Sequence, residues 1–129
     1  MNQETSKIKY VAYCRKSSED KERQVASIAD QKRELREYAE RENIHILKFF
    51  EESQSAHVRG RPIFGAMMAE FENGLANGLL VWHPNRIARN AFDGGWIITT
   101  IDESKLREVR TPYRVYGDHS DDKFFLQLE

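Results

Sequence analysis

Near the amino terminus, the residues best suited to chemistry are Arg15 and Ser17, two positions apart. They follow an apolar run over residues 8–12 that predicts a short buried strand. Because side chains alternate along a strand, Tyr13, Arg15 and Ser17 are expected on one face. A hydroxyl beside a guanidinium at a strand end could be a nucleophile facing a phosphate, since arginine binds phosphate oxygens through a planar fork. Alternatively, Ser17 or Ser18 could simply cap the helix that follows.

Further arginines follow the predicted ends of the second and third strands. Arg61 comes after the second strand, and Arg86 and Arg89 come after the third. Ligands of open α/β sheets bind at the carboxyl ends of the strands, so we expect these guanidinium groups to converge with Arg15 on one rim. Such a cluster would stabilise negative charge that develops in phosphoryl transfer. Taken singly, Arg86 and Arg89 are also typical of solvated helix charges, and Asn85 is typical of a helix cap.

The elements that must position these side chains alternate between strand and helix patterns. Strands are expected at the run over residues 8–12 and at 44–50, 79–82 and 114–116, and helices at about 21–43, from Pro62 to Gly74, and at about 92–106. A polar loop is expected from Glu51 to Gly60. This order predicts an α/β fold with a mostly parallel central sheet flanked by helices.

The composition indicates a soluble globular domain. The 129 residues are 40% hydrophobic and 32% charged, with no apolar run long enough to cross a membrane. Cys14 is the single cysteine, so an internal disulfide is excluded, and its place in the first strand favours a buried thiol over a reactive one. A cytoplasmic location is expected. The net charge of −1 predicts no broad basic surface for DNA.

Other chemistries receive little support from the sequence. The histidines lack zinc-ligand spacing, no glycine-rich phosphate loop follows the first strand, and the nucleophile elbow of serine hydrolases is absent. An acidic cluster near the end is more typical of a solvated turn than of a cation site; it consists of Asp118, Asp121 and Asp122.

With these residues collected, the chain resembles the catalytic domain of the serine recombinase (resolvase/invertase) family. The resemblance covers nearly the whole chain, and its specificity comes from many short segments in order at the family's spacing. The matching positions are residues 13–18, Gln24, Ser27, Ile28, Gln31 and residues 52–55, 60–62 and 81–90. Residues 93–96 also resemble a branch found in large recombinases of mobile elements.

The resemblance implies site-specific DNA recombination. Ser17 would be the nucleophile that forms a 5′-phosphoserine link and releases a 3′-hydroxyl. By the family's pattern, the phosphate-binding arginines would be Arg15, Arg61, Arg86 and Arg89. The polar supporting residues would be Tyr13, Gln31, Ser55 and Asn85. It also implies that no ATP, metal or other cofactor is needed, because the covalent link conserves the energy of the broken bond. The implied partners are duplex DNA and further copies of the chain, as homodimers that pair into a synaptic homotetramer, with no membrane.

Two departures from the family pattern affect these expectations. Asn85 stands where the family usually has aspartate, and an amide cannot accept a proton, so the resemblance supports no acid–base role there. The long dimerisation helix has barely begun at Glu129, so we expect residues 1–129 to be one catalytic domain of a longer protein, lacking its DNA-binding domain and weak in DNA binding and recombination alone. The alternative is a catalytically silent α/β interaction or oligomerisation module, although such a module would not need the Tyr13, Arg15 and Ser17 face.

Overall fold

A single five-stranded sheet forms the centre of the molecule. The computed structural model describes residues 7–16, 26–53, 61–87 and 90–117, and the strand order within them is β2-β1-β3-β4-β5. The strands are β1 (Tyr10–Arg15), β2 (Ile46–Glu52), β3 (Gly78–Val81), β4 (Glu108–Thr111) and β5 (Arg114–Tyr116). β1 to β4 pair in parallel, and β5 runs antiparallel to β4. The predicted mostly parallel sheet flanked by helices is confirmed.

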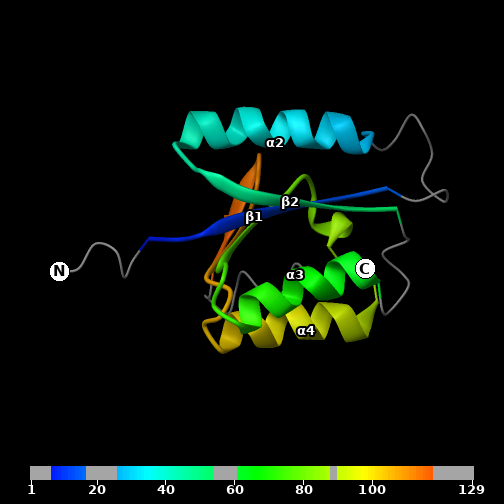
Figure 1. Ribbon diagram of the computed structural model, residues 1–129, viewed down its shortest axis with the longest axis vertical. Helices are drawn as coiled ribbons and strands as arrows, with labels where there is room; N and C mark the ends of the chain where they lie inside the picture. The colour runs from blue at the N-terminus through cyan, green and yellow to red at the C-terminus, as the bar shows by residue number, and fades with distance from the viewer. Residues whose placement is uncertain (1–6, 17–25, 54–60, 88–89, 118–129) are drawn as a thin grey trace.

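Helices cover both faces of this sheet (Figure 1). α2 (Ile28–Glu42) lies on one face, and α3 (Pro62–Glu72) and α4 (Ala91–Asp102) lie on the other. A short 3₁₀ helix, η1 (Pro84–Arg86), connects β3 to α4. The alternation of β1 side chains separates two hydrophobic clusters: Tyr13 packs with α3 and α4, while Cys14 packs with α2.

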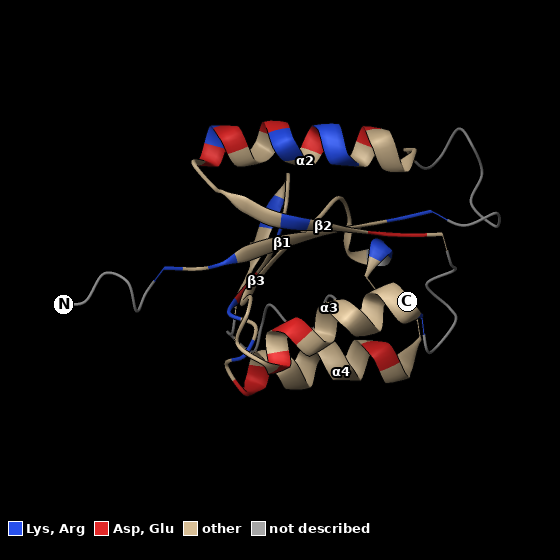
Figure 2. Cartoon of the chain, viewed as in Figure 1, with Lys and Arg blue, Asp and Glu red and all other residues tan. Residues whose placement is uncertain are grey.

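α2 is an amphipathic helix with a stop signal at each end. The Ser27 hydroxyl accepts a hydrogen bond from the Asp30 backbone N–H at 3.0 Å, and Asn43 ends the helix in the left-handed conformation with φ of 62°. Leu35, Tyr38 and other residues of one stripe are buried against the sheet. Acidic and basic residues alternate along the helix (Figure 2), so its outer face is the solvated charged surface that the sequence predicts.

α3 and α4 are largely uncharged and begin at well-defined signals. Pro62 occupies the first turn of α3, where its missing N–H is not needed, and the Met and Phe stripe of α3 is buried as predicted. The Asn90 side chain caps α4 by accepting a hydrogen bond from the Asp93 backbone N–H at 2.8 Å. Figure 1 shows that both helices start close to the edge of the sheet where the parallel strands end.

Several element boundaries differ from the prediction. β2 begins and ends two residues later than expected, so Glu51 and Glu52 belong to the strand and not to the loop. The sequence does not predict β4, because Glu-Val-Arg-Thr carries little apolar character, although the structure buries Val109 and Thr111. α4 ends four residues early, at Asp102. None of the helices in the described ranges is long and apolar enough to cross a membrane.

Candidate functional site

The carboxyl ends of the three central parallel strands meet at one edge of the sheet. Arg15, the last residue of β1, stands opposite Glu52, the last residue of β2, and Tyr13 stands opposite Val81, the last residue of β3. η1 follows β3 directly and carries Arg86. The topology therefore brings side chains from β1, β2 and the β3–α4 connection to one place, as the sequence predicts for a ligand site.

Buried charge is concentrated at this edge. Across the described part of the chain, the charged side chains that are buried are Arg15, Glu52, Arg61, Arg86 and Asp93, each no more than 2% exposed. Hydrogen bonds link these residues into two neighbouring networks, described below. Burying a charge is costly unless it is paired and hydrogen-bonded, so the gathering of all five residues at one edge marks a candidate functional site.

The first network ties Arg15 to Arg86. Arg15 Nε donates to the Arg86 carbonyl at 3.2 Å, and Arg86 Nη1 donates to the Arg15 carbonyl at 3.0 Å. The buried Gln31 side chain of α2 completes this network: its Oε1 accepts from the Arg15 backbone N–H at 3.2 Å, and its Nε2 donates to the Arg15 carbonyl at 3.0 Å. The last residue of β1 is therefore held by both α2 and η1.

The second network centres on Tyr13 and Glu52. The Tyr13 hydroxyl donates to Glu52 Oε1 at 2.6 Å, and the Glu52 carboxylate also accepts from the backbone N–H groups of Ile63 and Phe64, each at 2.9 Å. A carboxylate is favourable at a helix start, where backbone N–H groups are unpaired and the helix dipole is positive. Glu52 thus connects the end of β2 to the first turn of α3.

Arg61 joins the second network to α4. Its Nη1 donates to the Tyr13 hydroxyl at 2.9 Å, and its Nη2 donates to the Ile87 carbonyl at 2.6 Å and lies 3.3 Å from Asp93 Oδ2. The guanidinium carbon lies 4.3 Å from the centre of the Phe64 ring, a cation–π contact. One side chain therefore contacts β1, α3, the segment after η1, and α4.

Burial determines the protonation of two side chains on β1. Burial, opposed by the charge of Arg61 and reinforced by the hydrogen bond to Glu52, raises the pKa of Tyr13 above its ordinary value. Its hydroxyl therefore remains protonated and can donate to Glu52 while it accepts from Arg61. On the opposite face, Cys14 is buried as predicted, and burial raises the pKa of its thiol to about 12, which disfavours the reactive thiolate.

The structure brings Arg15, Arg61 and Arg86 together, but it buries them. The interpretation of Arg86 as a solvated helix charge is wrong, because the residue is 1% exposed. Asn85 does not cap α4, since Asn90 does; Asn85 lies in η1, and its side chain is outside what the structure describes. Other predicted site residues and alternatives lie outside the described residues: Ser17, Ser18, Ser55, Arg89 and the acidic cluster at 118–122.

Sequence reasoning missed the roles of Glu52 and Asp93. The sequence predicts a loop at Glu52 and contains Asp93 only within a family-like motif. A signal for Asp93 was present, because Asn followed three residues later by Asp resembles a capping box at a helix start. Nothing local could have shown that both carboxylates face inward toward Tyr13 and Arg61.

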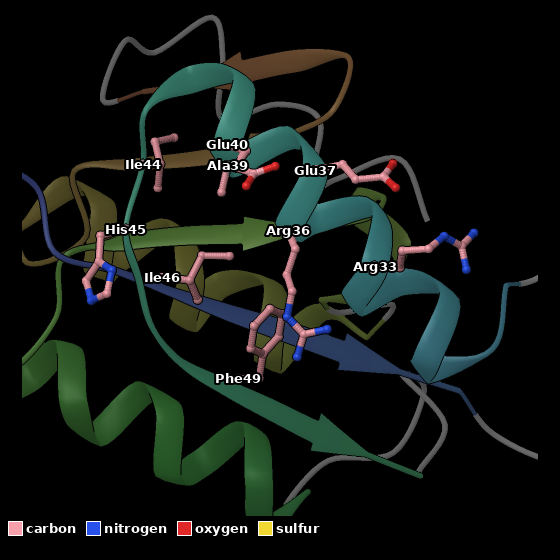
Figure 3. A pocket seen from close by; sticks show the side chains of 9 residues that line it. All are labelled: Arg33, Arg36, Glu37, Ala39, Glu40, Ile44, His45, Ile46 and Phe49. Atoms are coloured by element: carbon pink, nitrogen blue, oxygen red, sulfur yellow. The ribbon is translucent and has the colours of Figure 1, made fainter.

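A separate pocket lies away from these buried charged residues. It has a volume of about 470 Å³ and lies between α2 and the beginning of β2, with Ile44, Ile46 and Phe49 among its lining residues (Figure 3). Arg36 stacks over the Phe49 ring, and its guanidinium carbon lies 5.0 Å from the ring centre.

In the described segments, no group of three His, Cys, Asp or Glu side chains could hold a metal ion.

Comparisons with known proteins show the family through a family model and the fold through solved structures. A family model described as "Resolvase, N terminal domain" matches residues 10–128. Similar solved structures include the N-terminal catalytic domain of TP901-1 integrase, with a TM-score of 0.73 and 19% identity over 93% of this chain and 89% of the other. A resolvase family site-specific recombinase from Streptococcus pneumoniae has a TM-score of 0.68 and 23% identity over 95% of this chain and 83% of the other. The comparison with curated proteins found no match.

Proposed function

The chain belongs to the resolvase N-terminal domain family, and from this premise we propose that it cleaves and rejoins DNA strands in site-specific recombination. The observation that carries this proposal is the cluster of buried charge at the end of β1. Three arginines and two carboxylates give that cluster a net charge of +1, and its member Arg15 lies two residues before Ser17. A positive cluster in a dry environment is suited to stabilising a reacting phosphate.

In the proposed reaction, Ser17 is the nucleophile. Its Oγ attacks the phosphorus of a phosphodiester and loses its proton, the bond from phosphorus to the 3′-oxygen breaks, and that oxygen leaves as a protonated 3′-hydroxyl. The product is a 5′-phosphoserine link, which the 3′-hydroxyl of another strand attacks in the reverse reaction. Because one phosphoester replaces another, the rejoining step requires no external energy source.

The arginines supply positive charge during both steps. We propose that Arg15, Arg61, Arg86 and Arg89 stabilise the charge that develops on the phosphate oxygens. The guanidinium donors of Arg15 and Arg86 hold backbone carbonyl groups, so part of their effect is a fixed electrostatic field rather than direct contact.

The polar residues of the site have supporting roles in this proposal. Gln31 holds the end of β1, and Ser55 and Asn85 are proposed to assist at the same edge. Tyr13 positions Arg61 and Glu52 rather than accepting the proton of Ser17, because its hydroxyl is protonated and already donates to Glu52.

The proposed partners follow from family membership. Duplex DNA with recombination sites is the substrate, and homodimers pair into a synaptic homotetramer so that four strand ends can be exchanged, in the cytoplasm with the DNA. Analytical ultracentrifugation of the protein with and without DNA tests this assembly. A protein that stays monomeric on DNA that it cleaves would contradict it.

Formation of a covalent DNA adduct tests the reaction itself. The protein as its gene encodes it is incubated with supercoiled DNA carrying the recombination sites of its own genetic element, and the products are separated on a denaturing gel. We expect an adduct with the wild type, none with Ser17→Ala, and an undiminished adduct with the matched control Ser18→Ala.

Two other results of the adduct assay would each contradict a different part of the proposal. An adduct that persists in Ser17→Ala but disappears in Ser18→Ala would move the nucleophile by one residue. If the wild type gives no adduct on DNA that it binds, the silent interaction module becomes the better account.

A further inference from the structure

We propose that Asp93 is a positioning residue of this site, which holds the Arg61 guanidinium in the orientation that strand cleavage requires. The inference rests on the proposed function, because it concerns the rate of the Ser17 reaction. It goes beyond that function by adding a carboxylate from α4 to the residues on which catalysis depends.

The contact between the two residues is a buried ion pair. Arg61 Nη2 lies 3.3 Å from Asp93 Oδ2, and the two side chains are 0% and 1% exposed. Away from water the attraction between opposite charges is little screened, so the position of the carboxylate strongly affects the position of the guanidinium. Such a pair is sensitive to the loss of one partner, because the other then remains as an uncompensated buried charge.

Asn90 fixes the carboxylate in turn. The Asn90 side chain accepts a hydrogen bond from the Asp93 backbone N–H at 2.8 Å, and its Nδ2 donates to Asp93 Oδ2 at 3.0 Å. The same oxygen therefore faces both Asn90 and Arg61. Because Asn90 is the cap of α4, the start of this helix determines where the negative charge lies.

The other contacts of Arg61 explain why its orientation matters. Nη1 donates to Tyr13, Nη2 donates to the Ile87 carbonyl, and the guanidinium stacks on the Phe64 ring. The Nε–H group is buried and has no acceptor among the described residues. An unsatisfied buried donor is costly, so the other contacts of Arg61 must offset that cost, and among them Asp93 supplies the opposite charge.

The contact with Ile87 extends the effect to a second arginine. Ile87 follows Arg86 directly, and the Arg86 carbonyl accepts the Nε–H of Arg15. If Arg61 shifts, the backbone that orients Arg86 and Arg15 loses a hydrogen-bond donor. Asp93 therefore acts on the reacting phosphate through Arg61, without touching that phosphate itself.

The test compares four proteins in single-turnover cleavage at saturating DNA: wild type, Asp93→Asn, Arg61→Ala and the double variant. We expect Asp93→Asn to slow adduct formation at least tenfold while the DNA dissociation constant changes less than twofold. In the Arg61→Ala background, the same substitution should slow the reaction less than twofold further. The matched control is Asp102→Asn, an exposed carboxylate at the other end of α4, which should leave the rate unchanged.

A second measurement keeps the inference testable if a variant folds poorly. The Nε–Hε signal of Arg61 in a ¹⁵N spectrum of the chain, assigned by its loss in Arg61→Lys, should exchange with solvent at least tenfold faster in Asp93→Asn. An unchanged exchange rate of the Arg61 Nε–H group in Asp93→Asn would overturn the inference. So would a double variant in which Asp93→Asn slows adduct formation by the same factor as it does in the wild type. A wild type without any adduct would instead overturn the proposed function, while the exchange rate would still decide whether Asp93 holds Arg61.

Discussion

At the scale of single residues, the Glu52 carboxylate accepts several hydrogen bonds at once. Glu52 accepts from the Tyr13 hydroxyl and from two backbone N–H groups at the start of α3, and it is 2% exposed. No neutral side chain of the same size can accept all three hydrogen bonds, because an amide has one oxygen and carries two donors of its own. The residue therefore couples the position of Tyr13 to that of α3.

Replacing this carboxylate by an amide should destabilise the fold. In Glu52→Gln the new NH₂ group faces a buried donor, and leaving buried groups unsatisfied costs about 1–3 kcal/mol. Urea unfolding at neutral pH should show this decrease in the free energy of unfolding. The neighbouring Glu51→Gln is the matched control: Glu51 forms a surface ion pair with Lys32, so its loss should cost less than about 1 kcal/mol. Equal effects of the two substitutions would contradict the role of Glu52.

At the scale of elements, the helix starts control the geometry of the site. α2 begins at the Ser27 cap and presents Gln31 to the end of β1, α3 begins beside Glu52, and α4 begins at the Asn90 cap that holds Asp93. A helix start offers unpaired N–H groups and a well-defined backbone direction. Small changes in where each helix begins would therefore rotate the inward-facing polar residues away from the strand ends.

The cap of α2 gives a direct test at this scale. Ser27→Ala removes the acceptor for the Asp30 backbone N–H and should lower the free energy of unfolding by about 1 kcal/mol. Ser27→Asp keeps an acceptor at the same place and should restore most of the stability, which thermal and urea unfolding can measure. If alanine and aspartate behave alike, the cap does not contribute.

Across the whole molecule, several ionisable groups are buried in their protonated form. Burial and a hydrogen bond to Glu108 raise the pKa of Tyr10 to about 12, and burial raises the pKa of Cys14 to about 12. The pKa of Tyr13 is also raised, mainly by burial. Each of these groups keeps its proton in the native state at pH values where the unfolded chain has lost it.

The consequence is a loss of stability at alkaline pH. The ordinary pKa values are 10.0 for tyrosine and 9.0 for cysteine, so between about pH 9 and about 12 the unfolded chain binds fewer protons than the native chain. The free energy of unfolding must then fall as pH rises, and the full contribution is present only below about pH 9. Urea unfolding at pH 8, 10 and 11 checks this sign.

A substitution separates the contribution of Tyr10 from the rest. Tyr10→Phe should make the decline with pH less steep, while Tyr113→Phe, at a position 86% exposed, should leave it unchanged. Stability that is constant or rises from pH 8 to 11 would show that burial of these groups has little effect on the unfolding equilibrium.

The sequence by itself determined the order of the main elements and most of the arginine cluster. The apolar run before Tyr13, the buried stripe of α2 and Pro62 at the start of α3 are local patterns, and local patterns depend on residues within a few turns or one strand. The expectation that Arg15, Arg61 and Arg86 meet followed from one general rule, that parallel strands end at a common edge.

Only the tertiary structure decided which groups these arginines contact and that they are buried. Tyr13 and Glu52 are 39 residues apart in the chain, Arg61 and Asp93 are 32 apart, and Arg15 and Arg86 are 71 apart. Pairing at such distances depends on strand register and helix placement, and a shift of one residue in β2 would turn Glu52 to the other face of the sheet. No local pattern encodes that choice, because burial is a property of the packed molecule.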